Sequence, residues 1–224
     1  MCGRYTLALP LSELLAALQL DLPDFDFVPR YNLAPSQRLP IITNEGSLNL
    51  RLHRWGLIPF WAKNPAIGHK MINARGETLA EKPAFREALR QRRCLIPADG
   101  FYEWQKTPYG KVPHHIHFIN REVMTFAGLW ESWRDAQGKE IRSFTIITTS
   151  PNALMAPIHD RMPVIIPAAN RMRWLEMDLP QEAVLAQLCP YPAHEMQADP
   201  VSNAVNSPRN EGPSLLDPPA PSLF

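Results

Sequence analysis

Apolar and polar residues alternate over several short stretches of the chain, the pattern of half-buried β-strands. The stretches are residues 39–44, 48–55, 94–105, 114–119, 123–132 and 143–150. The turn-forming sequence NEGS separates the first two. Helical periodicity predicts helices instead over residues 11–20, 79–93, 151–157 and 167–177. Short strands at regular spacing with few helices predict an α+β fold around a mixed or barrel-like β-sheet core.

Proline is unusually frequent, with 24 prolines against 10 glycines in 224 residues. Proline fixes φ and removes an amide donor, so it favours short strands and fixed loops over long helices. We predict loops over residues 21–40 and 55–65, and a strand that begins the motif MINARGET at 71–78. The proline-rich end predicts a disordered tail over residues 214–224, behind a single domain at residues 1–213.

The formal net charge is only +1, which argues against a histone-like polycation. The charge is nevertheless unevenly distributed. Residues 1–175 carry a net charge of +7, and the segment from Glu176 onward carries −6. A basic body of this kind can bind a polyanion although the total charge is close to zero.

The cysteine content and the N-terminal sequence favour an intracellular protein. Cys2, Cys94 and Cys189 have no regular spacing and predict no disulfide framework. The sequence MCGRYTLALP lacks the basic and apolar regions of a secretory signal. No run of about 18 apolar residues is present to span a membrane. We expect a cytoplasmic protein without membrane association.

Cys2 is the most informative single residue. A methionine before a small residue is normally removed, which would leave Cys2 with a free α-amino group next to its thiol. Such a 1,2-aminothiol condenses with an aldehyde to an imine, and the thiol then closes a thiazolidine ring. Gly3 leaves room for a substrate to approach the backbone. The alternative is that Cys2 is merely a small residue tolerated after the initiator methionine.

Two further segments carry candidate polar groups. Asn73, Arg75 and Glu77 project to one face if MINARGET is a strand, and they line either a polar pocket or a solvated edge. Glu103 shares a strand face with Phe101, and an apolar neighbour would raise the pKa of its carboxyl toward that of a general acid or base. The alternative is an exposed strand glutamate.

His159 lies in IHDRMPVII, where Asp160, Arg161 and then Pro163 follow it. A histidine at a turn fixed by proline, beside an arginine, suits a proton shuttle next to an anion site. The alternative is an ordinary turn with a local pair between Asp160 and Arg161.

Two other groups give weaker signals. His114, His115 and His117 lack the spaced additional ligands of a zinc site, so we predict neither a metal nor a cofactor. Phe60 and Trp61, near proline and glycine, suit either stacking on nucleic-acid bases or packing in an aromatic core.

Seven motifs follow one another along the chain: MCGRYT, YNLAPSQ, WGLIPFW, INARGET, PADGFYEW, IHDRMPVI and VSNAVNSP. Their order closely resembles the SRAP (SOS response-associated peptidase) family over residues 2–213. The resemblance implies a protein that senses abasic sites in single-stranded DNA, including single-strand/duplex junctions, at replication forks. It implies that Cys2 captures the ring-opened abasic aldehyde as a covalent thiazolidine crosslink, which shields the site from cleavage and error-prone bypass.

The resemblance also implies individual roles. Asn73 would position the Cys2 amine or hold the thiazolidine, and Glu103 would act as the acid and base of imine formation. His159 would assist opening of the sugar ring and the reverse hydrolysis. The residues implied at the DNA are Arg4, Arg75 and Arg161 at phosphates, Trp61 and Phe60 at bases, and Pro35. Phe60 stands where relatives often carry a second tryptophan. We expect a monomer that is nucleoid-associated when bound to DNA.

Several alternatives stay open at this point. Removal of Met1 is either autocatalytic, with Cys2, Glu103 and His159 as nucleophile and acid/base groups, or the work of an ordinary aminopeptidase. A thiol peptidase acting on other proteins would also use an N-terminal cysteine, but it leaves the arginines unexplained. A non-covalent reader of single-stranded or modified DNA would use the arginines and aromatics without needing a free Cys2 amine.

Overall fold

Five strands of the computed structural model, which describes residues 2–43, 45 and 48–219, close into a β-barrel. They are β3 (Arg38–Thr43), β4 (Asn49–Trp55), β6 (Arg93–Ala98), β9 (Met124–Arg134) and β10 (Glu140–Thr149). The pairings run β10–β4–β3–β6–β9, and the ring closes because β9 also pairs with β10. Two short strands, β5 (Asn73–Arg75) and β11 (Met162–Pro163), pair with β10.

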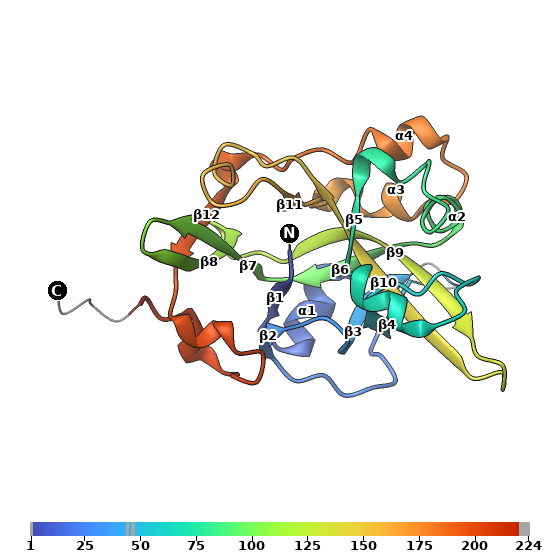
Figure 1. Ribbon diagram of the computed structural model, residues 1–224, viewed down its shortest axis with the longest axis horizontal. Helices are drawn as coiled ribbons and strands as arrows, with labels where there is room; N and C mark the ends of the chain where they lie inside the picture. The colour runs from blue at the N-terminus through green and yellow to red at the C-terminus, as the bar shows by residue number, and fades with distance from the viewer. Residues whose placement is uncertain (1, 44, 46–47, 220–224) are drawn as a thin grey trace.

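A second sheet packs against this barrel (Figure 1). Its strands are β1 (Arg4–Leu7), β2 (Arg30–Leu33), β7 (Gly100–Thr107), β8 (Gly110–Phe118) and β12 (Met196–Pro200). Their spatial order is β12–β8–β7–β1–β2, and all of these pairs are antiparallel. Only Asp99 separates β6 from β7, so the chain passes directly from the barrel into the second sheet.

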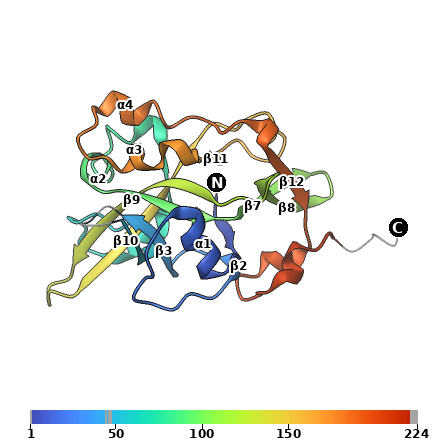
Figure 2. The same cartoon turned by 180° about the vertical axis from the view of Figure 1, so that it is seen from behind.

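Helices are few and short, which confirms the predicted α+β class. The α-helices are α1 (Leu11–Leu18), α2 (Arg86–Gln91), α3 (Arg171–Leu175) and α4 (Gln181–Leu185). The 3₁₀ turns are η1 (Pro65–Lys70), η2 (Gly76–Thr78), η3 (Ala168–Asn170), η4 (Ala193–Glu195), η5 (Asn203–Asn206) and η6 (Pro213–Leu216). Figure 1 and Figure 2 both show α2, α3 and α4 gathered at one end of the molecule. No helix among the described residues is long and apolar enough to cross a bilayer.

Buried aromatic rings join the two sheets. Tyr5 of β1 contacts Trp55 and Phe126 of the barrel, with ring centroids 5.3 Å and 6.0 Å apart. Phe101 of β7 makes a T-shaped contact with the same Phe126, with ring centroids 5.9 Å apart. Edge-to-face and tilted rings at these distances contribute packing energy beyond the area that they bury. They hold the start of β1, and therefore Cys2, at a fixed place between the sheets.

Most strand predictions are confirmed, and some boundaries are wrong. Segment 94–105 is two strands, because the chain turns at Asp99, whose amide donates to the carbonyl of Thr6 on β1. The loop predicted over 21–40 contains β2, which pairs with β1. The helix predicted over 79–93 is only α2, which begins after Pro83.

Further differences lie in the second half of the chain. Residues 151–157 form turns rather than an α-helix, and α3 covers only part of the helix predicted over 167–177. The segment expected as a tail is packed at its start, since Leu215 is buried in η6 and the amide of Ser202 donates to the carbonyl of Asp217. Residues 220–224 lie outside the described residues, as does part of the NEGS turn.

Candidate active site around Cys2

Cys2 lies just before β1, and its side chain is fully buried. Its thiol is 3.9 Å from the carbonyl oxygen of Arg4, a weak sulfur hydrogen bond. Burial raises the pKa of the thiol, and the nearby Glu103 carboxylate raises it further. The thiol is therefore protonated at neutral pH and needs a base before it can act as a nucleophile. Met1, whose removal was predicted, lies outside the described residues.

Asn73 is held beside Cys2 by the barrel. It is the first residue of β5, which pairs in parallel with β10 and sets Asn73 opposite Ile146. Its Nδ2 donates a hydrogen bond of 2.8 Å to the main-chain carbonyl oxygen of Cys2. Its Oδ1 is buried and accepts no hydrogen bond from the described residues. The hydrogen bond from Nδ2 therefore orients the Asn73 side-chain amide, and its Oδ1 is available as an acceptor.

Glu103 comes to the same place from the second sheet. In the pairing of β1 with β7, Arg4 lies opposite Tyr102, so continuing this register by one residue sets Gly3 opposite Glu103. The Glu103 side chain is buried, with 2% exposure, rather than the exposed strand glutamate of the alternative interpretation. Its carboxylate is close enough to Cys2 to raise the pKa of the thiol.

His159 follows the turns at 151–158, and its amide donates to the carbonyl of Met155 over 2.9 Å. Its ring is partly buried, and Nδ1 has two polar neighbours. The amide of Arg161 lies 3.0 Å from Nδ1, and Asp160 Oδ1 lies 2.9 Å from it. The first neighbour is a donor and the second an acceptor, so the surroundings of Nδ1 support either tautomer of the ring.

An open pocket of about 370 Å³ adjoins His159. Its lining residues are Trp104, Lys106, Ala156, Pro157, Ile158, His159 and Asp160. One wall therefore comes from β7, the strand that carries Glu103, and the other from the turn that carries His159.

The three predicted phosphate-binding arginines have different surroundings. Arg75 at the end of β5 is exposed. Arg4 is half-buried and donates to Oδ1 of Asn32 at 2.8 Å and to the carbonyl of Val205 at 2.9 Å. Arg161 makes a two-pronged contact with the Glu77 carboxylate. Arg4 and Arg161 are thus engaged by protein partners, and Arg75 faces solvent.

The motif VSNAVNSP is a strap across the second sheet. Asn32 donates to the carbonyls of Ser207 and Asn210 at 2.9 Å and 3.0 Å. Nε1 of Trp104 donates to Oδ1 of Asn206 at 2.6 Å. Asn32 lies in the motif YNLAPSQ and Asn206 in VSNAVNSP, and the sequence predicts no role for either residue. Their contacts join distant segments, and no local pattern signals them.

Phe60 and Trp61 are exposed at 56% and 49%, so they are not part of the aromatic core. Two surface pockets adjoin them; the lining residues include the basic side chains Lys63, Lys70 and Arg86. Pro35 is half-buried in the turn between β2 and β3, and the next residue, Ser36, contacts His69 of the η1 segment at 3.2 Å. The predicted DNA-contacting loops therefore lie next to each other.

The histidine cluster has structural partners. His115 and His117 lie side by side, with ring centroids 5.4 Å apart. His115 pairs with the hydroxyl of Thr6 at 3.0 Å, and His117 pairs with Asp199 at 2.8 Å. Over the part of the chain that the structure describes, no group of three or more His, Cys, Asp or Glu residues is arranged to hold a metal ion.

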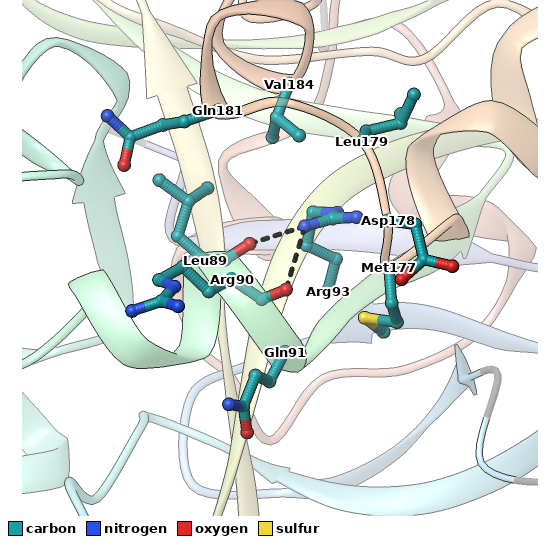
Figure 3. Close-up of a pocket in the computed structure, with 9 residues that line it drawn as sticks. All are labelled: Leu89, Arg90, Gln91, Arg93, Met177, Asp178, Leu179, Gln181 and Val184. Atoms are coloured by element: carbon teal, nitrogen blue, oxygen red, sulfur yellow. Dashed lines mark hydrogen bonds between the residues drawn. The ribbon is translucent and has the colours of Figure 1, made fainter.

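A separate pocket lies between α2 and the segment that leads into α4 (Figure 3). Arg93, one of its lining residues, donates to the carbonyls of Leu89 and Arg90 at 2.6 Å and 3.3 Å, and its Nε donates to the carbonyl of Trp174 at 2.7 Å. Arg93 is therefore a structural link between α2 and α3. None of the candidate site residues lines this pocket.

Known proteins resemble nearly the whole chain. A family model described as SOS response associated peptidase (SRAP) matches residues 1–208. The chain is 47% identical over 222 residues to the abasic site processing protein YoqW of Bacillus subtilis (strain 168), covering 97% of this chain and 99% of the relative. It is 46% identical over 222 residues to the abasic site processing protein YoaM of the same organism, covering 97% and 98%. A crystal structure of a protein from Bacteroides thetaiotaomicron matches with a TM-score of 0.89 and 28% identity, covering 97% of this chain and 99% of that one.

Proposed function

The chain belongs to the SOS response associated peptidase (SRAP) family, and we propose that it processes abasic sites in single-stranded DNA by forming a covalent crosslink through Cys2. The names of the relatives YoqW and YoaM support abasic-site processing. The hydrogen bond from Asn73 to the Cys2 carbonyl carries the proposal for the site, because it fixes the N-terminal cysteine beside a buried carboxylate.

The proposed reaction is a condensation. An abasic deoxyribose is partly a ring-opened aldehyde, and the α-amino group of Cys2, once Met1 is removed, attacks its carbonyl carbon. Water leaves, and an imine forms. The Cys2 sulfur then adds to the imine carbon, a C–S bond forms, and the thiol proton is transferred to nitrogen. The sum is one thiazolidine and one water.

Glu103 is the proposed acid and base of this sequence. Because burial and the Glu103 charge keep the Cys2 thiol protonated, ring closure needs a group that removes its proton. A buried carboxylate next to that thiol can take the proton and can also protonate the leaving hydroxyl. The same carboxylate therefore serves both steps in the proposed reaction.

We propose that Asn73 orients the α-amino group and that His159 transfers protons. With Nδ2 of Asn73 bound to the Cys2 carbonyl, its buried Oδ1 is suited to accept a hydrogen bond from the α-amino group. His159 has both a donor and an acceptor beside Nδ1, which suits a ring that protonates in one direction and deprotonates in the reverse. We assign it to sugar-ring opening and to reversal of the crosslink.

The surface around these residues suits single-stranded DNA. Exposed Arg75 lies two residues from Asn73, and a guanidinium there can pair with a backbone phosphate. Exposed Phe60 and Trp61 can stack on bases or wedge the strand at a duplex junction. A surface of this modest charge is sufficient for the initial non-covalent binding of DNA if the covalent bond then determines the lifetime of the complex.

A denaturing gel tests the proposal. Purified protein is mixed with a labelled single-stranded oligonucleotide that carries one abasic site, and heat-stable shifted product is measured. The wild type and Cys189→Ser, which alters an exposed cysteine, are expected to form the product. Cys2→Ala is expected to form none while it retains salt-sensitive binding.

Other results would support the alternatives. An equally stable product with Cys2→Ala would exclude the thiazolidine. Binding without any covalent product in the wild type would favour a non-covalent reader of DNA. Absence of both would leave the thiol peptidase as the better interpretation.

A further inference from the structure

Glu77 and Arg161 form a bidentate ion pair beside the site. Arg161 Nη1 lies 2.6 Å from Glu77 Oε1, and Nη2 lies 2.9 Å from Oε2. Nη2 also donates to the carbonyl oxygen of Thr148 over 2.7 Å. The hydrogen bond from Arg161 is the main cause that lowers the pKa of Glu77, so this carboxylate is ionised at neutral pH.

The pair joins the two segments that bring Asn73 and His159 to the site. Glu77 is in η2, which directly follows the strand β5 that Asn73 begins. Arg161 is two residues past His159, and its amide contacts Nδ1 of that ring at 3.0 Å. The two partners are 84 positions apart in the sequence.

Strand β10 pairs with both segments, with β5 and with β11. Thr148 pairs with Arg75 of β5 on one side and with Pro163 of β11 on the other. The contact of Arg161 with the Thr148 carbonyl therefore attaches the guanidinium to the strand with which both short strands pair. The Arg161 side chain is 14% exposed and that of Glu77 is 53% exposed, so the carboxylate closes the guanidinium off from solvent.

We propose that Glu77 is a positioning residue of the active site, which acts through Arg161 to hold the His159 turn against the strand that carries Asn73. Glu77 also interacts electrostatically with Arg75, whose charge helps to lower the pKa of this carboxyl, so the carboxylate is coupled to both arginines that lie near Asn73 and His159. This inference rests on the proposed function, since the residues being positioned are those assigned to the crosslink.

We expect the ion pair between Glu77 and Arg161 to affect the crosslinking rate more than the free energy of unfolding. Only the Glu77 partner is half-exposed, so solvent screens its charge, and the Thr148 carbonyl still accepts from Arg161 when that charge is removed; the loss of folding free energy should therefore be small. Small errors in the placement of reacting groups are costly for catalysis, in contrast, by about 10²-fold for a displacement of about 1 Å. Removal of Glu77 should therefore slow the chemistry in a protein that still folds.

The first experiment separates chemistry from binding in Glu77→Gln. The single-turnover crosslinking rate is measured at saturating protein with an abasic single-stranded oligonucleotide. Affinity is measured with an oligonucleotide that carries a tetrahydrofuran analogue, which cannot open to an aldehyde. We expect the rate to fall by about 10–100-fold. Affinity should stay the same or increase, because one negative charge is removed and the Arg161 charge is released toward the phosphates.

Glu81→Gln is the matched control, because Glu81 is an exposed acid four residues away. It removes the same charge without touching Arg161, and its crosslinking rate should match the wild type. Arg161→Lys keeps the charge but cannot make the bidentate contact, and should slow crosslinking like Glu77→Gln. The double variant should be no slower than the slower single variant, because both changes break one contact.

An NMR measurement keeps this inference distinct from the proposed function. The ring nitrogen signals of His159 should shift in Glu77→Gln and stay in place in Glu81→Gln, whether or not DNA is present. If the wild type forms no crosslink, the proposed function fails, and the His159 signals alone decide the positioning role. An unchanged crosslinking rate or unchanged His159 signals in Glu77→Gln would overturn the inference. So would a loss of affinity in proportion to the loss of rate.

Discussion

The side-chain amide of Asn73 donates to the main-chain carbonyl oxygen of Cys2 across 2.8 Å, although the two residues are 71 positions apart in the chain. Asn73 belongs to a strand attached to the barrel, and Cys2 precedes the first strand of the second sheet. The hydrogen bond therefore spans both halves of the fold, and the candidate site is complete only when the two sheets are packed together.

Asn73→Asp removes the donor at nearly constant size and places a charged oxygen against the Cys2 carbonyl. Because the Cys2 backbone is then no longer held in place, we expect the single-turnover crosslinking rate to fall by about 10–100-fold. Binding of an oligonucleotide with a tetrahydrofuran site should change much less. A variant that crosslinks at the wild-type rate would remove Asn73 from the mechanism.

Glu103→Gln keeps the shape of a buried side chain and removes its acid/base function. Loss of a general acid or base is expected to slow crosslinking by about 10²–10⁴-fold. The substitution also removes a negative charge that raises the pKa of the Cys2 thiol, so that pKa should decrease. Rapid-quench measurement of adduct formation checks the rate, and a rate equal to that of the wild type would contradict the assigned role.

His53 should make folding sensitive to acid. Burial, with a contribution from Arg142, lowers the pKa of His53 to about 3. In the unfolded chain the same ring takes up a proton below about pH 6.5. Between pH 6.5 and 3 the unfolded state therefore binds one more proton than the folded state. The free energy of unfolding decreases as the pH is lowered through this range, by up to about 1.4 kcal/mol per pH unit.

His53→Phe tests this linkage, because it keeps the edge-to-face contact with Trp130 and removes the titrating group. Urea unfolding at pH 7, 6 and 5 should give a shallower decline for the variant. Burial also lowers the pKa of His115 to about 3, so this second histidine should maintain part of the pH dependence in the variant. Identical slopes for the wild type and the variant would show that His53 does not contribute.

Asn32 should be important for stability rather than for chemistry. Its side-chain oxygen accepts from Arg4, and its Nδ2 donates to the carbonyls of Val205 and Ser207 in the strap and to that of Asn210 just beyond it. In Asn32→Ala these partners lose their hydrogen bonds, which should cost about 1–3 kcal/mol of unfolding free energy. Urea denaturation measures the loss, and limited proteolysis should show earlier cleavage within residues 203–211. Wild-type values in both assays would mean that the strap is held by other contacts.

Local patterns predicted much of the sheet structure and little of the tertiary contacts. Alternation over 143–150 is a period-two signal, and it predicted part of β10. Strand β2 has no sequence signal, because its four residues lie between prolines and show no clear alternation. In MINARGET the strand ends at Arg75, so Glu77 leaves the expected shared face and turns to Arg161. A contact between residues so far apart has no local signal.

The predicted site residues also differ in how far local sequence patterns predict their surroundings. Burial of Glu103 follows from the strand face that it shares with Phe101, which sequence can suggest. The engagement of Arg4 by Asn32 and Val205 depends on how the C-terminal strap closes over β1 and β2. That closure spans 201 positions between Arg4 and Val205, and only the folded chain reveals it.

The intact mass of the denatured adduct tests the central claim most directly. A thiazolidine on Cys2 predicts the mass of the chain without Met1, plus the abasic oligonucleotide, minus one water. Borohydride treatment should leave this mass unchanged, because the imine has already been closed by sulfur. An adduct that gains two hydrogens on reduction would be an open imine, and an adduct that retains Met1 would not involve the Cys2 amine. Either result would contradict the account.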